Sequence, residues 1–557
     1  MLKKQNIQLF HYLGNCKSIS IDVKCDNAKI SEVVLNKKVP FEVNVPRMII
    51  LICICLVFYS LKTAQFWKDI YNPRSFKQNL VLLLIVYFGI MIIFFVNKGC
   101  GNFDIKDLYN DNLVKALSKG NVVISNTPDT SKLDELNNPY DAIEREKLNR
   151  DTDYIWDAAY FNHKYYVYYG AVPAVLLMVP YYLITKKLMS SAITTLIFSI
   201  LSVPVLVLLT KKVFQKFWKD LPFKYMAFSS LIMSIGTMLI WINVAPRFYE
   251  LVTVAGFFFA ILGFLLVFDS EKKTENENEV SYLKVFFGCL SLALAVGCRP
   301  THFLTSLLIL PILVRIFLQI MKEKKKLIIL IVSVVVPYVV VAVLIMRYNY
   351  LRFGNVFEFG ESYQLTINNM NKLSLRWNLL PTGILCSLFG LPTFQGFFPF
   401  IHANGNLIDT FGYYYVEDMP GGVFFLVPIA FFCFGIFSVL KKSKEDKDYK
   451  SFVISLLLVG LIFVTFISLK AGSTGRYLLD FAWIFVLCGI CIFMKIVQNL
   501  KTDEGRKILE KVLGVIVCYT LIINILLGFC SVGGNNFMRN NSPKQYFKSE
   551  YTIMILK

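Results

Sequence analysis

Long runs of apolar residues, separated by short polar connectors rich in lysine, dominate the pattern along the chain. A run of about 18 or more apolar residues can cross a hydrocarbon layer of about 30 Å as a helix, which satisfies its own backbone polar groups there. The pattern therefore predicts an all-α polytopic membrane protein with about 12 transmembrane helices. The predicted spans lie near residues 47–62, 79–96, 190–210, 224–244, 249–268, 283–298, 302–320, 327–346, 421–440, 451–469, 477–496 and 511–530.

The N-terminal segment has a different pattern. In "KSISIDVKC" and "EVVLNKKVPFEV" polar and apolar residues alternate with a period of two, which is typical of β-strands. We therefore expect three parts: a small β-rich extracytoplasmic appendage at 1–46, a transmembrane domain at 47–530, and a C-terminal tail at 531–557.

Two apolar stretches are poor candidates for full spans. Residues 170–184 are short and hold two prolines, and residues 376–402 are interrupted by three. If 170–184 crosses the membrane, the basic connector 211–224 lies outside the cell. If it only enters the outer leaflet, five lysine-rich connectors all lie in the cytoplasm, as the positive-inside rule expects. Both stretches are therefore predicted to be partly embedded outer segments, and full crossing by both would raise the helix count to about 14.

This sidedness places the longest loops, 97–189 and 347–420, on the extracytoplasmic face, and the first should carry juxtamembrane helices. The formal net charge of +20 would suit a soluble nucleic-acid-binding protein. Here, however, the lysines and arginines lie in connectors between apolar runs, which positive-inside topology explains. We expect a multi-pass protein of the cell membrane with its active face outside, in contact with the lipid bilayer and with no nucleic-acid partner.

Acidic and aromatic residues gather in the first long loop. Near its start, just above the bilayer, stand Asp104, Asp107 and Asp111. Its end, "DTDYIWDAAYFNHKYYVYYG", adds Asp157 and Lys164 as further candidates, although tyrosines there also fit an interfacial aromatic belt. Carboxylates can hold a divalent metal, but neither a Cys/His cluster nor a short acidic motif requires one, so no cofactor is predicted.

A short helix is predicted beside the first aspartates. Four apolar residues fall roughly on one helical stripe: Leu108, Leu113, Val114 and Leu117. Such a stripe predicts a helix that lies flat on the membrane.

Arginines recur in the outer turns. Arg247 and Glu250 stand one helical turn apart in "WINVAPRFYELVTV", Arg299 lies in "GCRPTHF", and Arg476 lies in "KAGSTGRYLLDF". A single arginine at a helix end usually anchors it among lipid headgroups. Several on one face, together with carboxylates, favour a cavity for an anionic headgroup, because guanidinium matches phosphate oxygens bidentately.

The arrangement resembles the GT-C superfamily of membrane glycosyltransferases, including bacterial polyprenyl-phosphate-sugar enzymes related to the dolichyl-phosphate-mannose-protein mannosyltransferase-like families. The likeness covers about residues 79 to 500. Asp107 in "DLYNDNLVKALSKG" resembles the first-loop acid of the family, Glu250 in "RFYEL" the second acidic position, and Arg476 in "GRYLLDF" the phosphate-binding arginine. The resemblance implies a GT-C-like fold, a polyprenyl-phosphate sugar donor, and an envelope glycan, lipid or protein as acceptor.

The resemblance also implies roles for the candidate residues. Asp107 would act as general base on the acceptor hydroxyl, and Glu250 would orient the acceptor or share that role. Arg476, helped by Arg247 or Arg299, would hold the departing phosphate, on which charge builds up in the transition state.

Two other functions fit an apolar helical frame. A lipid or polysaccharide transporter or flippase would show internal symmetry, or broken helices with charges near the bilayer midplane. A non-enzymatic scaffold would keep the helices without catalysis. In this chain the charges gather at one face, which favours the enzyme.

Overall fold

The computed structural model describes residues 45–101, 112–125, 127–168, 170–273, 278–367, 369–370, 375–442, 446–469 and 472–553. The β-rich appendage predicted for 1–46 therefore lies outside the described residues, apart from its last two. So do Asp104, Asp107 and Asp111 of the first outer loop.

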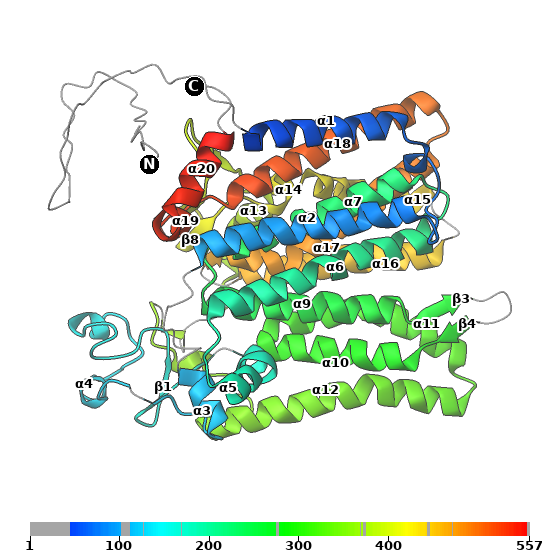
Figure 1. The fold of residues 1–557 in the computed structure, drawn as a ribbon. Helices are drawn as coiled ribbons and strands as arrows, with labels where there is room; N and C mark the ends of the chain where they lie inside the picture. The colour runs from blue at the N-terminus through cyan, green and yellow to red at the C-terminus, as the bar shows by residue number, and fades with distance from the viewer. Residues whose placement is uncertain are drawn as a thin grey trace, which may run out of the picture.

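Most of the described chain forms one bundle of helices that lie side by side (Figure 1). In chain order they are α1 (Val45–Thr63), α2 (Phe76–Cys100), α6 (Ser191–Phe217), α7 (Phe223–Ile235), α8 (Leu239–Ile242), α9 (Phe248–Phe268), α10 (Tyr282–Cys298), η5 (Pro300–Ile309), α11 (Leu310–Ile320), α12 (Lys324–Phe353), α14 (Val423–Leu426), η9 (Pro428–Gly435), α15 (Ile436–Lys442), α16 (Lys447–Ser468), η10 (Gly475–Tyr477), α17 (Leu478–Asn499) and α18 (Asp503–Leu527).

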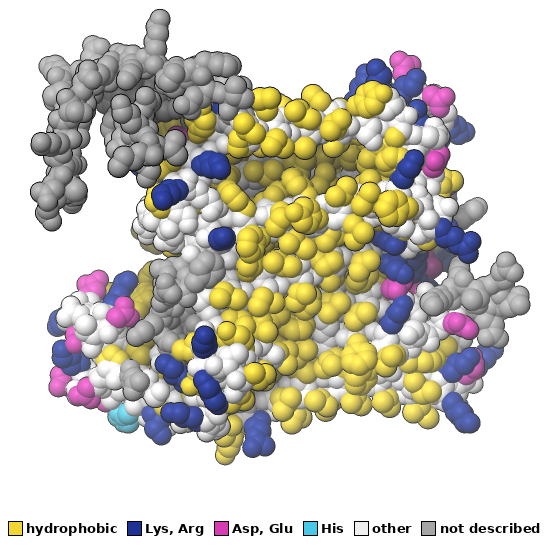
Figure 2. Space-filling view, in the orientation of Figure 1, with side chains coloured by type: hydrophobic (Ala, Val, Ile, Leu, Met, Phe, Trp, Pro, Cys, Tyr) yellow, Lys and Arg dark blue, Asp and Glu magenta, His cyan; other side chains and the backbone are white. Residues whose placement is uncertain are grey.

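Among the described residues, ten segments are long and apolar enough to cross a membrane, counting α7 with α8, η5 with α11 and η10 with α17. Hydrophobic side chains cover the middle of the bundle, and charged ones gather at its two ends (Figure 2). The protein is therefore a multi-pass membrane protein. Two predicted spans are shorter than the rest: α10 has 17 residues, and 421–440 is divided among α14, η9 and α15.

The two ends of the bundle differ. At one end, called here the hairpin end, β3 (Glu271–Lys273) pairs with β4 (Asn278–Val280). The opposite end, called the loop end, carries the long loops and the C-terminal tail (Figure 1). Apart from the helices of the bundle and this hairpin, the chain forms shorter elements: α3 (Val114–Ser118), α4 (Ser131–Asp134), β1 (Ala159–Phe161), β2 (Lys164–Tyr166), α5 (Val179–Thr185), α13 (Leu380–Phe389), β5 (Thr393–Phe394), β6 (Ile401–His402), β7 (Asn404–Ile408), β8 (Tyr414–Met419), β9 (Gly472–Thr474), α19 (Phe537–Asn541) and α20 (Pro543–Ile553).

The two stretches predicted to be partly embedded form short helices. Ala174–Thr185 and Trp377–Phe389 are apolar but fall below the length of a span. The first joins a five-residue turn to the seven residues of α5. At about 1.5 Å per residue it extends about 18 Å, less than a hydrocarbon layer of about 30 Å.

The first outer loop packs on itself and on residues that follow α12. The described part of the helix predicted to lie flat on the membrane includes α3, whereas Leu108 lies outside the described residues. Leu113 and Val114 are fully buried in a cluster with Tyr154, Val167 and Leu365. These apolar residues therefore contact the interior of the loop rather than a lipid surface, because the later part of the same loop and Leu365 cover them.

A three-stranded sheet at the loop end joins two distant parts of the chain. β7 pairs antiparallel with β8, and β8 pairs parallel with β9, so that Glu417 lies opposite Thr474. The tail lies against the same end: Asn541 donates a hydrogen bond to the Cys100 carbonyl, and Gln545 to that of Phe95. The sheet thereby joins the second long loop to the start of α17, and the tail is held on the end of α2.

α17 lies at the centre of the bundle. In the most apolar window of this span 94% of the residues are buried inside the protein, compared with 0% for α1. A helix that is apolar on every side is stable in such a position because neighbours cover all its faces. Residues at the start of α17 are consequently held by the most tightly packed part of the structure.

Close packing against α17 gives a test of the fold. A Cβ at Gly489 would lie 2.2 Å from the Ile429 carbonyl oxygen and 2.9 Å from the Ala430 Cα, so η9 must move if this glycine is replaced. We expect Gly489→Ala to destabilise the protein by about 1–3 kcal/mol and to lower the midpoint of thermal unfolding in detergent. In the control Gly514→Ala, in α18, the new methyl group meets nothing within 4 Å, and alanine favours the helix by about 1 kcal/mol. Equal midpoints for the two variants would contradict this account of the α17 packing.

Candidate functional site

The turn between α8 and α9 contains an ion pair between Arg247 and Glu250. Arg247 is the N-cap of α9, and Glu250 stands at the third position of the helix. Glu250 Oε2 accepts hydrogen bonds from Arg247 N at 3.2 Å and Nε at 3.4 Å, and Oε1 accepts one from Nη2 at 3.1 Å. The Glu250 carboxylate raises the pKa of Arg247 above its ordinary value. Both oxygens of Glu250, which is only 5% exposed, are thus engaged in holding Arg247.

Arg476, in η10 just before α17, lies close to this ion pair. The parallel pairing of β8 with β9 sets Glu417 opposite Thr474, and Arg476 Nη1 lies 3.5 Å from Glu417 Oε2. The guanidinium of Arg476 also lies 4.7 Å from the ring centre of Tyr249, and that of Arg247 lies 5.9 Å from it. Both arginines therefore contact one aromatic ring, within the range of a cation–π interaction.

Arg299 completes the group from the end of α10. Its Nη1 lies 2.9 Å from Asp480 Oδ2 and donates to Thr253 Oγ1 at 3.1 Å. Its guanidinium is 4.9 Å from the ring centre of Tyr477, and that of Arg476 is 5.5 Å from the same centre. Arg247, Arg476 and Arg299, called here the arginine cluster, are therefore connected through two tyrosine rings, although they come from three separate turns.

A small hollow, with a cavity volume of about 10 Å³, opens beside the cluster. Its lining residues are Trp241, Ile242, Ala245, Arg247, Glu250, Asp418, Thr474, Arg476 and Val532. Gly475 lets its walls approach, because a Cβ there would lie 2.6 Å from both the Asp418 carbonyl oxygen and Trp241 Nε1. The hollow combines cations, carboxylates and apolar side chains at one end of a membrane bundle, a combination that suits an amphipathic anion.

The structure brings some of the sequence-predicted site residues together and places others elsewhere. It brings Arg247, Glu250 and Arg476 together in the lining of the hollow, with Arg299 next to them through Tyr477. The other candidates among the described residues lie elsewhere. Asp157 is buried in the first loop and accepts a hydrogen bond from Gln364, and Lys164 is exposed on β2.

Sequence reasoning missed two acids, Glu417 and Asp418. They are adjacent in "YYYVEDMPGG", at the end of a segment that forms β8. Two neighbouring carboxylates in an outer loop were the available signal. What could not be read from the sequence is that β8 pairs with β9, which places these acids beside Arg476.

Within the described ranges, no group of three or more His, Cys, Asp or Glu side chains is placed to hold a metal ion. The aspartates at the start of the first loop lie outside those ranges.

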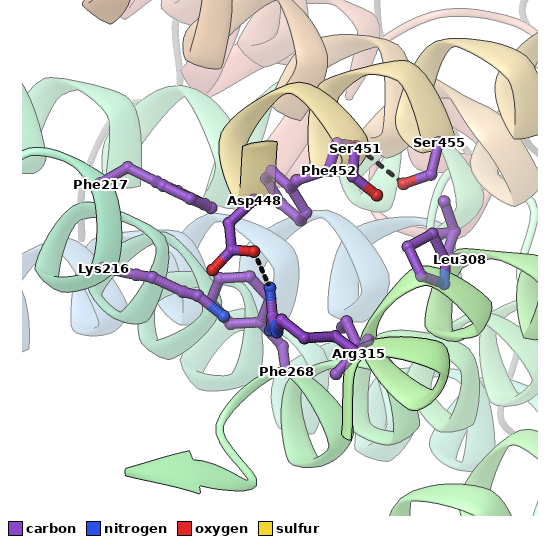
Figure 3. Close-up of a pocket in the computed structure, with 11 residues that line it drawn as sticks. Lys216, Phe217, Phe268, Leu308, Arg315, Asp448, Ser451, Phe452 and Ser455 are labelled. Carbon is purple, nitrogen blue, oxygen red and sulfur yellow. Dashed lines mark hydrogen bonds and ion pairs between the residues drawn. The ribbon is translucent and has the colours of Figure 1, made fainter. Parts of the chain in front are cut away.

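A second hollow lies at the other end of the bundle, near the hairpin. Figure 3 shows Lys216, Arg315 and Asp448 pointing toward one another between apolar walls. Arg315 pairs with Asp448 at 3.0 Å and also with Glu271, and Lys216 lies 3.3 Å from Glu271. Two cations are matched by two carboxylates, so this group has the composition of an ion-pair network that joins helix ends.

Comparisons with known proteins give distant structural likenesses. No protein-family model matches the chain, and no curated protein matches it. Among solved structures, the archaeal oligosaccharyltransferase AglB from Archaeoglobus fulgidus, in complex with an inhibitory peptide and a dolichol-phosphate, is 12% identical with a TM-score of 0.45. The match covers 87% of this chain and 60% of that one, so the chain spans less than two thirds of that enzyme.

ArnT from Cupriavidus metallidurans was solved in two states. Bound to undecaprenyl phosphate, it is 11% identical over 83% of this chain and 77% of that one, with a TM-score of 0.40. Its apo state is 11% identical over 84% and 78%, with a TM-score of 0.35.

Proposed function

We propose that the protein is an integral membrane glycosyltransferase of the GT-C type. It transfers a sugar from a polyprenyl-phosphate donor to an extracytoplasmic acceptor: a cell-envelope glycan, a lipid or a protein. The single observation that carries this proposal is the convergence of Arg247, Arg476 and Arg299 beside one hollow at the loop end.

Phosphate is the ligand that this cluster fits best. A guanidinium donates two parallel hydrogen bonds to phosphate oxygens, and it keeps its charge at any physiological pH. The cluster stands where helices α9 and α17 begin, which is the depth of lipid headgroups if these helices cross the bilayer. A lipid-linked phosphate can therefore meet the arginines while its prenyl chain stays in the hydrocarbon.

The reaction needs these cations because phosphate is the leaving group. As the bond from the sugar to the phosphate oxygen breaks, negative charge grows on that oxygen, and preorganised cations stabilise the transition state more than the ground state. Arg476 and Arg247 line the hollow and contact the phosphate in this proposal. Arg299 supports them through Tyr477.

Two carboxylates keep the arginines in place before the donor binds. Glu250 holds Arg247 through three hydrogen bonds. Glu417 holds Arg476 at 3.5 Å, and its side chain is 38% exposed, so an incoming phosphate can take its position on Arg476 at small cost. The resemblance of the sequence to GT-C enzymes assigns the general base to Asp107, alone or with Glu250, and leaves Asp104 and Asp111 as neighbouring candidates.

Activity is tested with purified full-length protein in lipid nanodiscs. The protein is incubated with a panel of radiolabelled polyprenyl-phosphate sugars and a membrane extract as acceptor, and released or transferred sugar is counted. Transport of intact donor between leaflets of a vesicle, without release of sugar, would support the flippase alternative and contradict the enzyme.

Arg476→Gln should lower kcat/KM for transfer by about 100- to 1000-fold, as expected when a donor to the developing anion is removed. Because Arg476 contacts the phosphate in the ground state as well, binding of sugar-free polyprenyl phosphate should also weaken. The matched control is Arg539→Gln, since Arg539 is exposed at the same end of the bundle and packs on Phe547. Transfer by Arg476→Gln within threefold of the wild type would remove this residue from the phosphate site.

The proposed sidedness has its own test. A cysteine at Asp409, exposed between β7 and β8, should react with a membrane-impermeant maleimide on intact cells. A cysteine at Glu279, exposed in β4 at the hairpin end, should react only after permeabilisation. Labelling is compared with the parent protein, whose own cysteines give the background, and the reverse pattern would place the arginine cluster in the cytoplasm.

A further inference from the structure

Among the residues that the structure describes, four carboxylates lie at the arginine cluster, and three of them are engaged with an arginine. Glu250 is bound through both oxygens to Arg247. Asp480, with no exposed surface, lies 2.9 Å from Arg299. Glu417 lies 3.5 Å from Arg476. An acceptor hydroxyl that bound to one of these three carboxylates would have to compete with the arginine already there.

Asp418 is the fourth carboxylate, and its contacts differ from those of the other three. It lines the hollow together with Arg247 and Arg476, yet it forms no ion pair with any Lys, Arg or His of the described residues. Its Oδ1 accepts a hydrogen bond from the Gly533 backbone N–H at 2.7 Å. Oδ1 is thus held by the C-terminal tail, and Oδ2 accepts no hydrogen bond from another described residue.

The backbone around Asp418 fixes where this carboxylate stands. Asp418 has a φ of 46°, in the left-handed region that aspartate tolerates better than most residues. It lies near the end of β8, which is pinned by parallel pairing with β9, and its carbonyl oxygen lies so close to Gly475 that a Cβ there would be 2.6 Å away. The position is therefore set by the same strand that sets Arg476.

We infer that Asp418 is the catalytic proton acceptor of the proposed glycosyl transfer. An acceptor hydroxyl in the hollow donates its proton to the second oxygen of Asp418, and its oxygen forms a bond to the anomeric carbon of the sugar. The bond from that carbon to the phosphate oxygen breaks, and the polyprenyl phosphate leaves with the electron pair, held by Arg476 and Arg247. Asp418 then releases the proton to water.

This inference rests on the proposed function and names the base within it. It differs from the resemblance, which points to Asp107 or Glu250. Glu250 would have to give up Arg247 before it could accept a proton, whereas Asp418 needs no such rearrangement. Asp107 is compared with Asp418 directly in the experiment.

The experiment measures transfer by Asp418→Asn in the full-length protein, with sugar transfer and binding of undecaprenyl phosphate determined separately. We expect kcat/KM to fall about 100-fold or more, the usual contribution of a general base. The low-pH limb of the kcat/KM profile, which reports protonation of that base, should disappear. Binding of undecaprenyl phosphate should stay within twofold of the wild type, because the arginine cluster is intact.

The control is Asp409→Asn, which removes an exposed carboxylate from the turn between β7 and β8 and should leave transfer and its pH profile unchanged. Three outcomes overturn the inference: transfer by Asp418→Asn within threefold of the wild type, loss of lipid-phosphate binding in this variant, or loss of the low-pH limb in Asp107→Asn instead. A wild-type protein that transfers sugar from none of the donors overturns the proposed function as well, so the two failures are distinguishable.

Discussion

A guanidinium near hydrocarbon cannot lose its charge, so each one has to be given a partner. This constraint shapes the loop end of the protein. Removing an ion from water costs several kcal/mol even after the protein relaxes, and arginine stays protonated under all conditions that a cell offers. Arg299 meets the constraint with Asp480, which is fully buried at the start of α17.

The same constraint explains why three like charges can stand close together. Arg247, Arg476 and Arg299 each have a carboxylate within 3.5 Å, and the rings of Tyr249 and Tyr477 lie between neighbouring guanidinium groups. An aromatic face attracts a cation through its quadrupole. Each guanidinium is therefore matched by a carboxylate, and a phosphate can bind by replacing Glu417, the most exposed of these three partners.

The position of the cluster depends on the central helix. Arg476 precedes α17 and Asp480 lies in its first turn, and α17 is buried along almost its whole length. A site built on a rigid element keeps its geometry better than one built on loops alone. The second long loop is attached to the start of α17 through the pairing of β8 with β9, and the tail is attached to this loop through the hydrogen bond from Gly533 N–H to Asp418.

The membrane-spanning helices could be predicted from the amino-acid sequence, because the length of an apolar run is a local property. All 12 predicted spans coincide with helices, ten of them long enough to cross a membrane. The stretch 376–402, which three prolines interrupt, is helical only as far as Phe389. The contact between Arg247 and Glu250 is also local in the sequence, since the two residues lie one helical turn apart.

Only the tertiary structure decided which distant residues share the hollow. The apolar residues Leu113 and Val114 were predicted to lie on the membrane, but they are covered by parts of the loop whose path the helical period does not encode. In the chain, Asp418 and Arg476 are separated by α14, η9, α15 and α16, and the parallel pairing of β8 with β9 brings them together. Contacts between such distant residues depend on how the helices pack and on the paths of the loops between them. The hydrophobic periodicity within one segment does not predict these contacts.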